Sequence, residues 1–128
     1  MAYEIKGLAH IGLMVKDMET SVHFYRDLLG FTVTDEANVG SHLVFCNNGN
    51  CYLELIQPKE YAARVPGQFD HVALEVKGIE ELRAFLAENG VNVPEKANFA
   101  GNILGGVYNI FFNGPDGERI ELFEYTNR

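Results

Sequence analysis

Four ionisable side chains interrupt apolar stretches in which a charged group is costly. They are His10 within Leu8–Leu13, Glu54 within Tyr52–Ile56, His71 within Asp70–Leu74, and Glu121 within Arg119–Phe123. An unpaired carboxylate or imidazole in a protein core costs several kcal/mol, so the four groups need a shared partner. Two imidazole nitrogens and two carboxylates together form a ligand set that a divalent cation binds and neutralises. The sequence therefore predicts one metal site made of His10, Glu54, His71 and Glu121.

The positions of these residues in a repeat strengthen this prediction. A single histidine or glutamate on a strand faces solvent or pairs locally more often than it binds metal. Here the ten residues from His10 align with the ten from His71, with five identities, and the segment around Glu54 aligns with the segment around Glu121. The offsets are 71 − 10 = 61 and 121 − 54 = 67 residues. An ordered pair of matches with similar offsets indicates a duplicated unit of about 60 residues.

Each copy is expected to fold as βαβββ, which places the four residues on strands. In the first copy, a strand over Leu8–Val15 precedes a helix capped by Asp17 and ended by Gly30. Its apolar stripe is Met18, Val22, Tyr25 and Leu29. The remaining strands are expected over Phe31–Thr34, Ser41–Asn47 and Asn50–Ile56.

The second copy repeats this order. A strand over Phe69–Val76 precedes a helix that ends at Gly90, and its apolar stripe is Ile79, Leu82, Phe85 and Leu86. The remaining strands are expected over Val91–Val93, Val107–Asn113 and Arg119–Tyr125. We therefore predict an α+β fold in one domain, with one module over residues 6–57 and the other over residues 69–126.

A hairpin turn decides which side chains share the face of Glu54. If Asn48 and Gly49 form a two-residue type I′ turn, Cys46 lies opposite Cys51, and both point away from Glu54 because the faces of a strand alternate. Two reduced cysteines that pack in the interior are the expected result. The residues expected to line the Glu54 face are Leu43, Phe45, Tyr52 and Ile56.

Two further histidines are left out of the predicted site. By the same alternation, His42 leaves the Glu54 face. His23 lies opposite the apolar stripe of the first helix, near Glu19 and Arg26, and is expected to be solvated.

Composition excludes several classes of partner. The 128 residues form one domain, and 10 basic against 18 acidic side chains give a net charge of −8. A surface of this sign repels nucleic acids and anionic membranes. No apolar run reaches the roughly 20 residues of a membrane span, and the first residues do not resemble a secretory signal. We expect a cytoplasmic protein that acts on a small molecule.

Several short motifs in their order along the chain resemble the vicinal oxygen chelate superfamily, the glyoxalase and bleomycin-resistance group. These motifs are the His10 strand, Phe24–Phe31, Leu53–Leu55, Asp70–Ala73, Pro115–Gly117 and Ile120–Leu122. The resemblance implies paired βαβββ modules whose curled mixed sheets form a cup around a divalent metal. It also implies that His10, Glu54, His71 and Glu121 are the metal ligands, and that the protein is a homodimer.

The complete His-Glu-His-Glu set is most similar to bacterial glyoxalase I, the lactoylglutathione lyase, which uses nickel or zinc. Cobalt or manganese is also compatible with these ligands. Members with three ligands, such as extradiol dioxygenases and fosfomycin thiol transferases, leave no role for Glu54. The resemblance implies a lyase or isomerase that moves a proton through an enediolate stabilised by the metal. Glu121 would loosen from the metal and take the proton, with Glu54 as its counterpart on the opposite side.

Two positions depart from glyoxalase I. The residues four positions after the first and second ligands contact glutathione in that enzyme, and here they are Met14 and Pro58, neither of which binds a carboxylate. A different thiol adduct or another small carbonyl compound is therefore expected. The alternatives are a methylmalonyl-CoA epimerase, for which Glu36 is the nearby candidate for a second base, and a noncatalytic protein that sequesters a small ligand.

Overall fold

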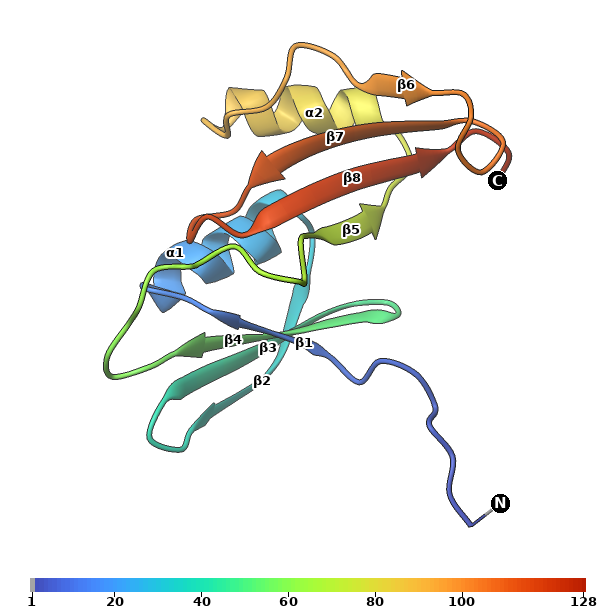
Figure 1. The fold of residues 1–128 in the computed structure, drawn as a ribbon. Coiled ribbons are helices and arrows are strands. Elements are labelled where there is room, and N and C mark those ends of the chain that lie inside the picture. The colour runs from blue at the N-terminus through green and yellow to red at the C-terminus, as the bar shows by residue number, and fades with distance from the viewer. Residues whose placement is uncertain (1) are drawn as a thin grey trace. The chain divides into compact units, whose positions relative to one another are not determined.

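The computed structural model describes residues 2–128, which divide into two compact units (Figure 1). Unit 1 ends at Ala62, and unit 2 is Ala63–Arg128. Each unit consists of a four-stranded mixed sheet and one helical segment, and each is described here by itself. This architecture confirms the predicted α+β class.

Unit 1 follows the predicted βαβββ order. Its strands are β1 (Ile11–Met14), β2 (Thr32–Asn38), β3 (His42–Asn48) and β4 (Cys51–Gln57), in the sheet order β1-β4-β3-β2. Strand β1 runs parallel to β4, and the other neighbours are antiparallel. The helical segment, α1 (Met18–Val22) followed by the π-helix η1 (His23–Leu28), connects β1 to β2.

Unit 2 repeats the same topology. Its strands are β5 (Val72–Glu75), β6 (Asn98–Ala100), β7 (Val107–Asn113) and β8 (Arg119–Tyr125), in the order β5-β8-β7-β6, and α2 (Ile79–Glu88) connects β5 to β6. Strand β5 is parallel to β8, as β1 is to β4. The two sheets therefore place equivalent residues of the repeat at equivalent positions.

Alternating burial along β3 and β4 gives the sheet of unit 1 one packed face and one open face. In β4, Leu53 and Leu55 are buried whereas Tyr52 is exposed, and Glu54 and Ile56 are partly exposed. Helix α1 packs on β3 and β4, and α2 packs on β8. This separation follows from the period of two in a strand, and it leaves Glu54 on the open face.

The last strand of each unit along the chain, β4 or β8, also caps the helix of that unit. The side-chain oxygen of Gln57 accepts a hydrogen bond from the backbone N–H of Met18 at 2.8 Å. At the equivalent place in unit 2, Glu124 accepts bonds from the N–H groups of Gly78 at 2.8 Å and Ile79 at 3.2 Å. These bonds satisfy backbone donors that a helix start leaves unpaired, so they fix each helix to its sheet.

Two predicted elements are wrong in detail. Val91–Val93 is not a strand, and the edge strand of unit 2 is Asn98–Ala100 instead. The first helix buries Phe24 and Leu28 rather than Val22 and Leu29, because its second half is a π-helix that rotates the apolar stripe.

The hairpin between β3 and β4 differs from its prediction by the register of the pairing. The two loop residues are Gly49 and Asn50, and Cys46 lies opposite Leu53 rather than Cys51. Gly49 has a φ of 68°, and glycine at the first loop position is typical of a type II′ turn. The predicted faces are nevertheless correct, because the pairing shifted by two residues and preserved the alternation.

The cysteines provide a test of which face of β3 is buried. Cys46 is fully buried, and burial raises the pKa of its thiol, while Cys51 is partly exposed. In a Cys51→Ser variant, we expect alkylation of Cys46 at pH 8 to be at least about tenfold slower in the native protein than in urea, because the thiolate is the reactive form. Mass spectrometry of the time course measures this ratio, and equal rates would contradict the burial of Cys46.

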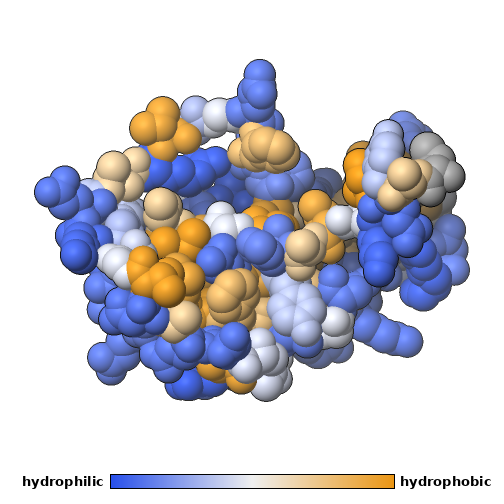
Figure 2. All heavy atoms as spheres, turned by 90° about the horizontal axis from the view of Figure 1, so that it is seen from below, coloured by the Kyte–Doolittle hydropathy of each residue, from blue (hydrophilic) through white to orange (hydrophobic). Residues whose placement is uncertain are grey.

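Figure 2 shows hydrophobic side chains exposed among hydrophilic ones on the face that it draws. Large hydrophobic residues that are exposed on the open side of the strands include Met14 and Tyr52. Among residues 2–128, no helix combines the length and the apolar character that crossing a bilayer requires.

Candidate metal centre

The structure brings the four predicted residues together as two pairs, one in each unit. Glu54 lies in the middle of β4 between Gly12 and Phe45 of the neighbouring strands, and His10 directly precedes β1. The two histidines were expected in strand centres, but the parallel pairing of each sheet begins one residue after them. His10 and His71 therefore lie directly before the first residues of β1 and β5.

In unit 1, His10 and Glu54 contact each other on the open face of the sheet. The Nε2 atom of His10 is 3.2 Å from Oε1 of Glu54, and the two side chains are 44% and 18% exposed. The edge of the ring of Phe45 faces the imidazole, with 5.9 Å between ring centroids. Because His10 and Glu54 are both partly exposed, this pair of donors beside Phe45 can bind a ligand from solvent.

Unit 2 builds the same pair with closer packing. The Nε2 atom of His71 is 3.1 Å from Oε1 of Glu121, and the side chains are 31% and 9% exposed. The ring of Phe111 takes the place of Phe45, at 5.1 Å from the imidazole. The premise that all four groups are buried in a core is wrong, since only Glu121 is buried and the others are partly or well exposed.

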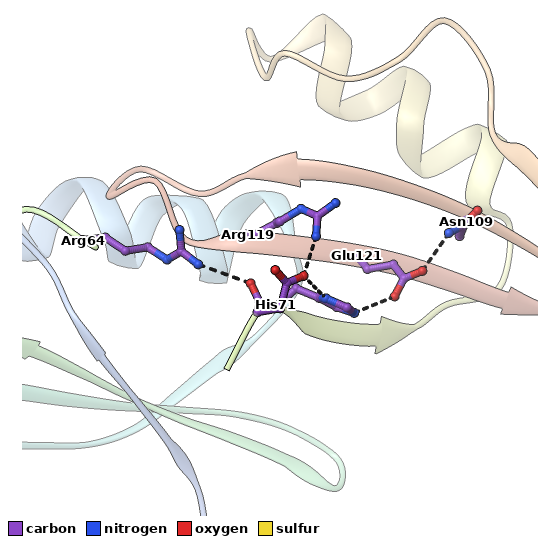
Figure 3. A network of polar contacts seen from close by, with 6 residues as sticks. Arg64, His71, Asn109, Arg119 and Glu121 are labelled. Carbon is purple, nitrogen blue, oxygen red and sulfur yellow. Dashed lines mark hydrogen bonds and ion pairs between the residues drawn. The ribbon is translucent and has the colours of Figure 1, made fainter. Parts of the chain in front are cut away.

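A network of polar residues surrounds the second pair (Figure 3). The Nδ1 atom of His71 is 2.7 Å from Oδ2 of Asp70, and Nη1 of Arg119 donates to the same carboxylate oxygen. The Nδ2 atom of Asn109 donates to Oε2 of Glu121 at 2.7 Å. The hydrogen bond with His71, and the contacts with Arg119, hold the pKa of Asp70 below its usual value.

This donor set fits a divalent metal in two respects. Two ligands that each lie about 2.1 Å from an ion, at an angle near 90°, are about 3 Å apart, which matches both His–Glu separations. In unit 2, Oδ2 of Asp70 lies 2.7 Å from Nδ1 of His71, where a carboxylate can accept the Nδ1 proton and leave Nε2 to bind a metal. Metal-binding histidines are oriented by carboxylates in this way.

Within each unit, the described residues include no group of three or more His, Cys, Asp and Glu side chains arranged to hold a metal. Each unit therefore supplies two donors rather than a complete site.

The structure also shows where Glu36 and His23 lie. Glu36 lies opposite Val44, on the packed face of the sheet, and contacts His42. It is on the other side of the sheet from Glu54, so the hypothesis that Glu36 acts as a second base beside Glu54 is wrong. His23 is exposed and contacts Asp27, in agreement with its predicted solvated position.

Comparisons with known proteins identify the family. A family profile described as the Glyoxalase/Bleomycin resistance protein/Dioxygenase superfamily matches residues 7–122. The chain belongs to this superfamily. The match covers both His–Glu pairs, so both lie within the region that defines the family.

Proteins similar to this chain include a metallothiol transferase and a glyoxalase family protein. The chain is 28% identical over 121 residues to the metallothiol transferase FosB of Staphylococcus epidermidis, with 92% of this chain and 83% of FosB covered. A glyoxalase family protein from Enterococcus faecalis has a TM-score of 0.77 and 28% identity, with 93% and 98% of the two chains covered.

The fosfomycin resistance protein FosX of Listeria monocytogenes, solved as a mutant in complex with Mn(II), has the same fold. Its TM-score is 0.80 at 18% identity, with 97% of this chain and 95% of that chain covered.

Proposed function

We propose that His10, Glu54, His71 and Glu121 bind one divalent metal ion and that the protein is a metal-dependent lyase or isomerase of the glyoxalase type. The observation that carries this proposal is the pair of His–Glu contacts, 3.2 Å and 3.1 Å, at equivalent positions of two duplicated sheets. One pair alone supplies two donors, and a catalytic metal site generally uses three or more protein ligands. The duplication supplies the other two.

The bound metal would polarise two oxygens on adjacent carbons of a small substrate and stabilise the charge that develops when a neighbouring proton leaves. The carboxylates of Glu54 and Glu121 are the groups that we propose for this proton transfer, since each lies beside a donor nitrogen within a partly solvent-shielded sheet face. Nickel, zinc, cobalt and manganese are candidates for the ion, and Mn(II) is the ion bound to FosX.

The surroundings of Glu54 favour an uncharged or apolar part of the substrate. Met14 shares the open face with Glu54 and is well exposed, and Leu43 and Tyr52 lie on the same face. None of these side chains forms a bidentate contact with a carboxylate as arginine does. We therefore propose an adduct of a 2-oxoaldehyde with a thiol other than glutathione, and we expect the protein to be a homodimer.

Thiol transfer to a small electrophile is the second candidate, favoured by the similarity to FosB over 92% of the chain. Both reactions use a metal that polarises substrate oxygens, but only the lyase needs a carboxylate that removes a proton from carbon.

The experiment compares three reactions with protein loaded separately with Ni²⁺, Zn²⁺, Co²⁺ or Mn²⁺. The substrates are methylglyoxal with cysteine, bacillithiol, coenzyme A or glutathione, then fosfomycin with the same thiols, and finally methylmalonyl-CoA. We expect metal-dependent formation of a 2-hydroxyacyl thioester, fastest with a thiol other than glutathione. The His42→Ala variant serves as a control, because His42 lies on the packed face of the sheet. Turnover of fosfomycin alone, or of methylmalonyl-CoA alone, would overturn the lyase proposal.

A further inference from the structure

We infer that Asn109 is a positioning residue that fixes Glu121 as a permanent ligand, and that Glu54 is the carboxylate that moves to transfer the proton. This inference rests on the proposed function and divides the roles of its two glutamates. It reverses the assignment that the family resemblance implies for Glu121.

A neighbouring side chain holds the carboxylate of Glu121 in place. Oε2 accepts the hydrogen bond from Nδ2 of Asn109 at 2.7 Å, and Oε1 faces Nε2 of His71 at 3.1 Å. The amide of Asn109 is itself oriented, because its Oδ1 accepts a bond of 3.0 Å from Nδ2 of Asn98. The buried carboxylate of Glu121 cannot rotate without losing its charge-assisted hydrogen bond with Asn109.

The histidine beside Glu121, His71, is also held in place. The carboxylate of Asp70 contacts Nδ1 of His71 at 2.7 Å and accepts from Arg119. The guanidinium of Arg119 lies over the ring of Phe111, with Cζ 4.0 Å from its centroid, and that ring packs against the imidazole of His71. The second pair is therefore fixed by Asp70, which precedes β5, and by neighbours on β7 and β8 (Figure 3).

The same positions in unit 1 carry other residues. Strand pairing makes Phe45 equivalent to Phe111, since each lies opposite the glutamate of its sheet, and Leu43 then corresponds to Asn109. By the same registers, apolar or uncharged residues replace the rest of the network. In unit 1 the residues equivalent to Asp70, Asn98 and Arg119 are Ala9, Ala37 and Tyr52.

Glu54 consequently has fewer restraints than Glu121. Among the described residues of unit 1, the polar contact that holds its carboxylate is the one with His10. Gly12, which has no Cβ atom, lies beside the carboxylate of Glu54. The side chain of Glu54 is twice as exposed as that of Glu121, at 18% against 9%. Release of Glu54 from the metal therefore breaks fewer contacts than release of Glu121.

The first test measures metal affinity rather than turnover. Titration of the full chain with Mn²⁺, followed by electron paramagnetic resonance of the free ion, gives the dissociation constant for each variant. We expect Asn109→Leu, which installs the residue found in unit 1, to weaken Mn²⁺ binding about 10- to 100-fold, as loss of an outer-sphere ligand contact does. Asn109→Gln, which keeps the amide, should recover a large part of the loss.

The matched control is Leu43→Ala, which changes the equivalent position of unit 1. Its Mn²⁺ affinity should stay within about twofold of the unmodified protein, since Leu43 makes no polar contact with Glu54. If Asn109→Leu fails to fold, as judged by circular dichroism, Asn109→Ser provides the same comparison. Equal affinities for the unmodified protein and the folded Asn109 variants would overturn the positioning role.

The second test separates the two carboxylates. We expect Glu121→Gln to lose Mn²⁺ affinity at least about 30-fold, and Glu54→Gln to lose less than about tenfold while its turnover falls at least about 1000-fold. The reverse order of metal affinities would overturn the role of Glu54. Absence of Mn²⁺ binding by the unmodified protein would instead overturn the proposed function, so the two failures are distinguishable.

Discussion

Replacement of His10 or of His71 with alanine is expected to lower the affinity for divalent metal at least about 100-fold. Neither variant should keep a tightly bound ion at the His–Glu pair that remains intact. The physical reason is that each histidine supplies one of four donors to the same ion, so loss of either weakens the whole site. Outer-sphere changes alone cost 10- to 100-fold, and replacing a ligand with alanine, which unlike glutamine keeps no donor atom, costs more. Isothermal titration calorimetry with Zn²⁺ gives both the affinity and the number of ions per chain.

The double variant provides the sharper comparison. Because His10 and His71 act on one ion, the two losses should be strongly non-additive, with the double variant little worse than either single one. The His42→Ala variant changes a histidine of the opposite sheet face and should bind like the unmodified protein. Two ions bound per unmodified chain, with one retained by each single variant, would show that the pairs bind metal separately.

Truncation of Leu122 to alanine should lower the free energy of unfolding by about 2–5 kcal/mol. Leu122 is 0% exposed and lies next to Glu121 on β8, but on the packed face of the sheet. The loss combines the transfer free energy of the missing carbons with the cavity that remains. Since small domains are stable by about 5–15 kcal/mol, urea unfolding followed by circular dichroism should detect this change readily.

A matched surface change shows whether the effect comes from burial. Val65, also in unit 2, is 82% exposed, so Val65→Ala should change the free energy of unfolding by less than about 0.5 kcal/mol. A small effect of Leu122→Ala, similar to that of Val65→Ala, would contradict the burial of Leu122 in the core.

Much of the fold could be predicted because the repeat and the strand alternation agree. The bounds of β7 and β8 were predicted correctly, since apolar residues alternate on both sides of a clear Gly-Pro-Asp-Gly turn. The edge strand Asn98–Ala100 was missed because three residues with one open edge carry little periodic signal. The π-helical turn of η1 was missed because propensity favours an α-helix there.

The two His–Glu pairs could be predicted from the duplication, but their supporting residues could not. Asp70, Asn109 and Arg119 each look like ordinary polar residues of strands or strand ends. Their role depends on which residues lie opposite one another, and the register of a hairpin is not fixed by sequence when two turns compete. Comparison of the copies at the offset of 67 residues would have given one signal, because Arg119 replaces the uncharged Tyr52 of the first copy.

The central claim is that all four residues share one ion, and crystallography with anomalous scattering tests it most directly. Crystals grown with Zn²⁺ and measured on both sides of the zinc absorption edge locate every bound zinc ion. The account predicts one strong peak per site, with a nitrogen of His10, a nitrogen of His71 and oxygens of Glu54 and Glu121 within about 2.0–2.2 Å. Separate peaks on the two His–Glu pairs, or no zinc at either pair, would contradict it.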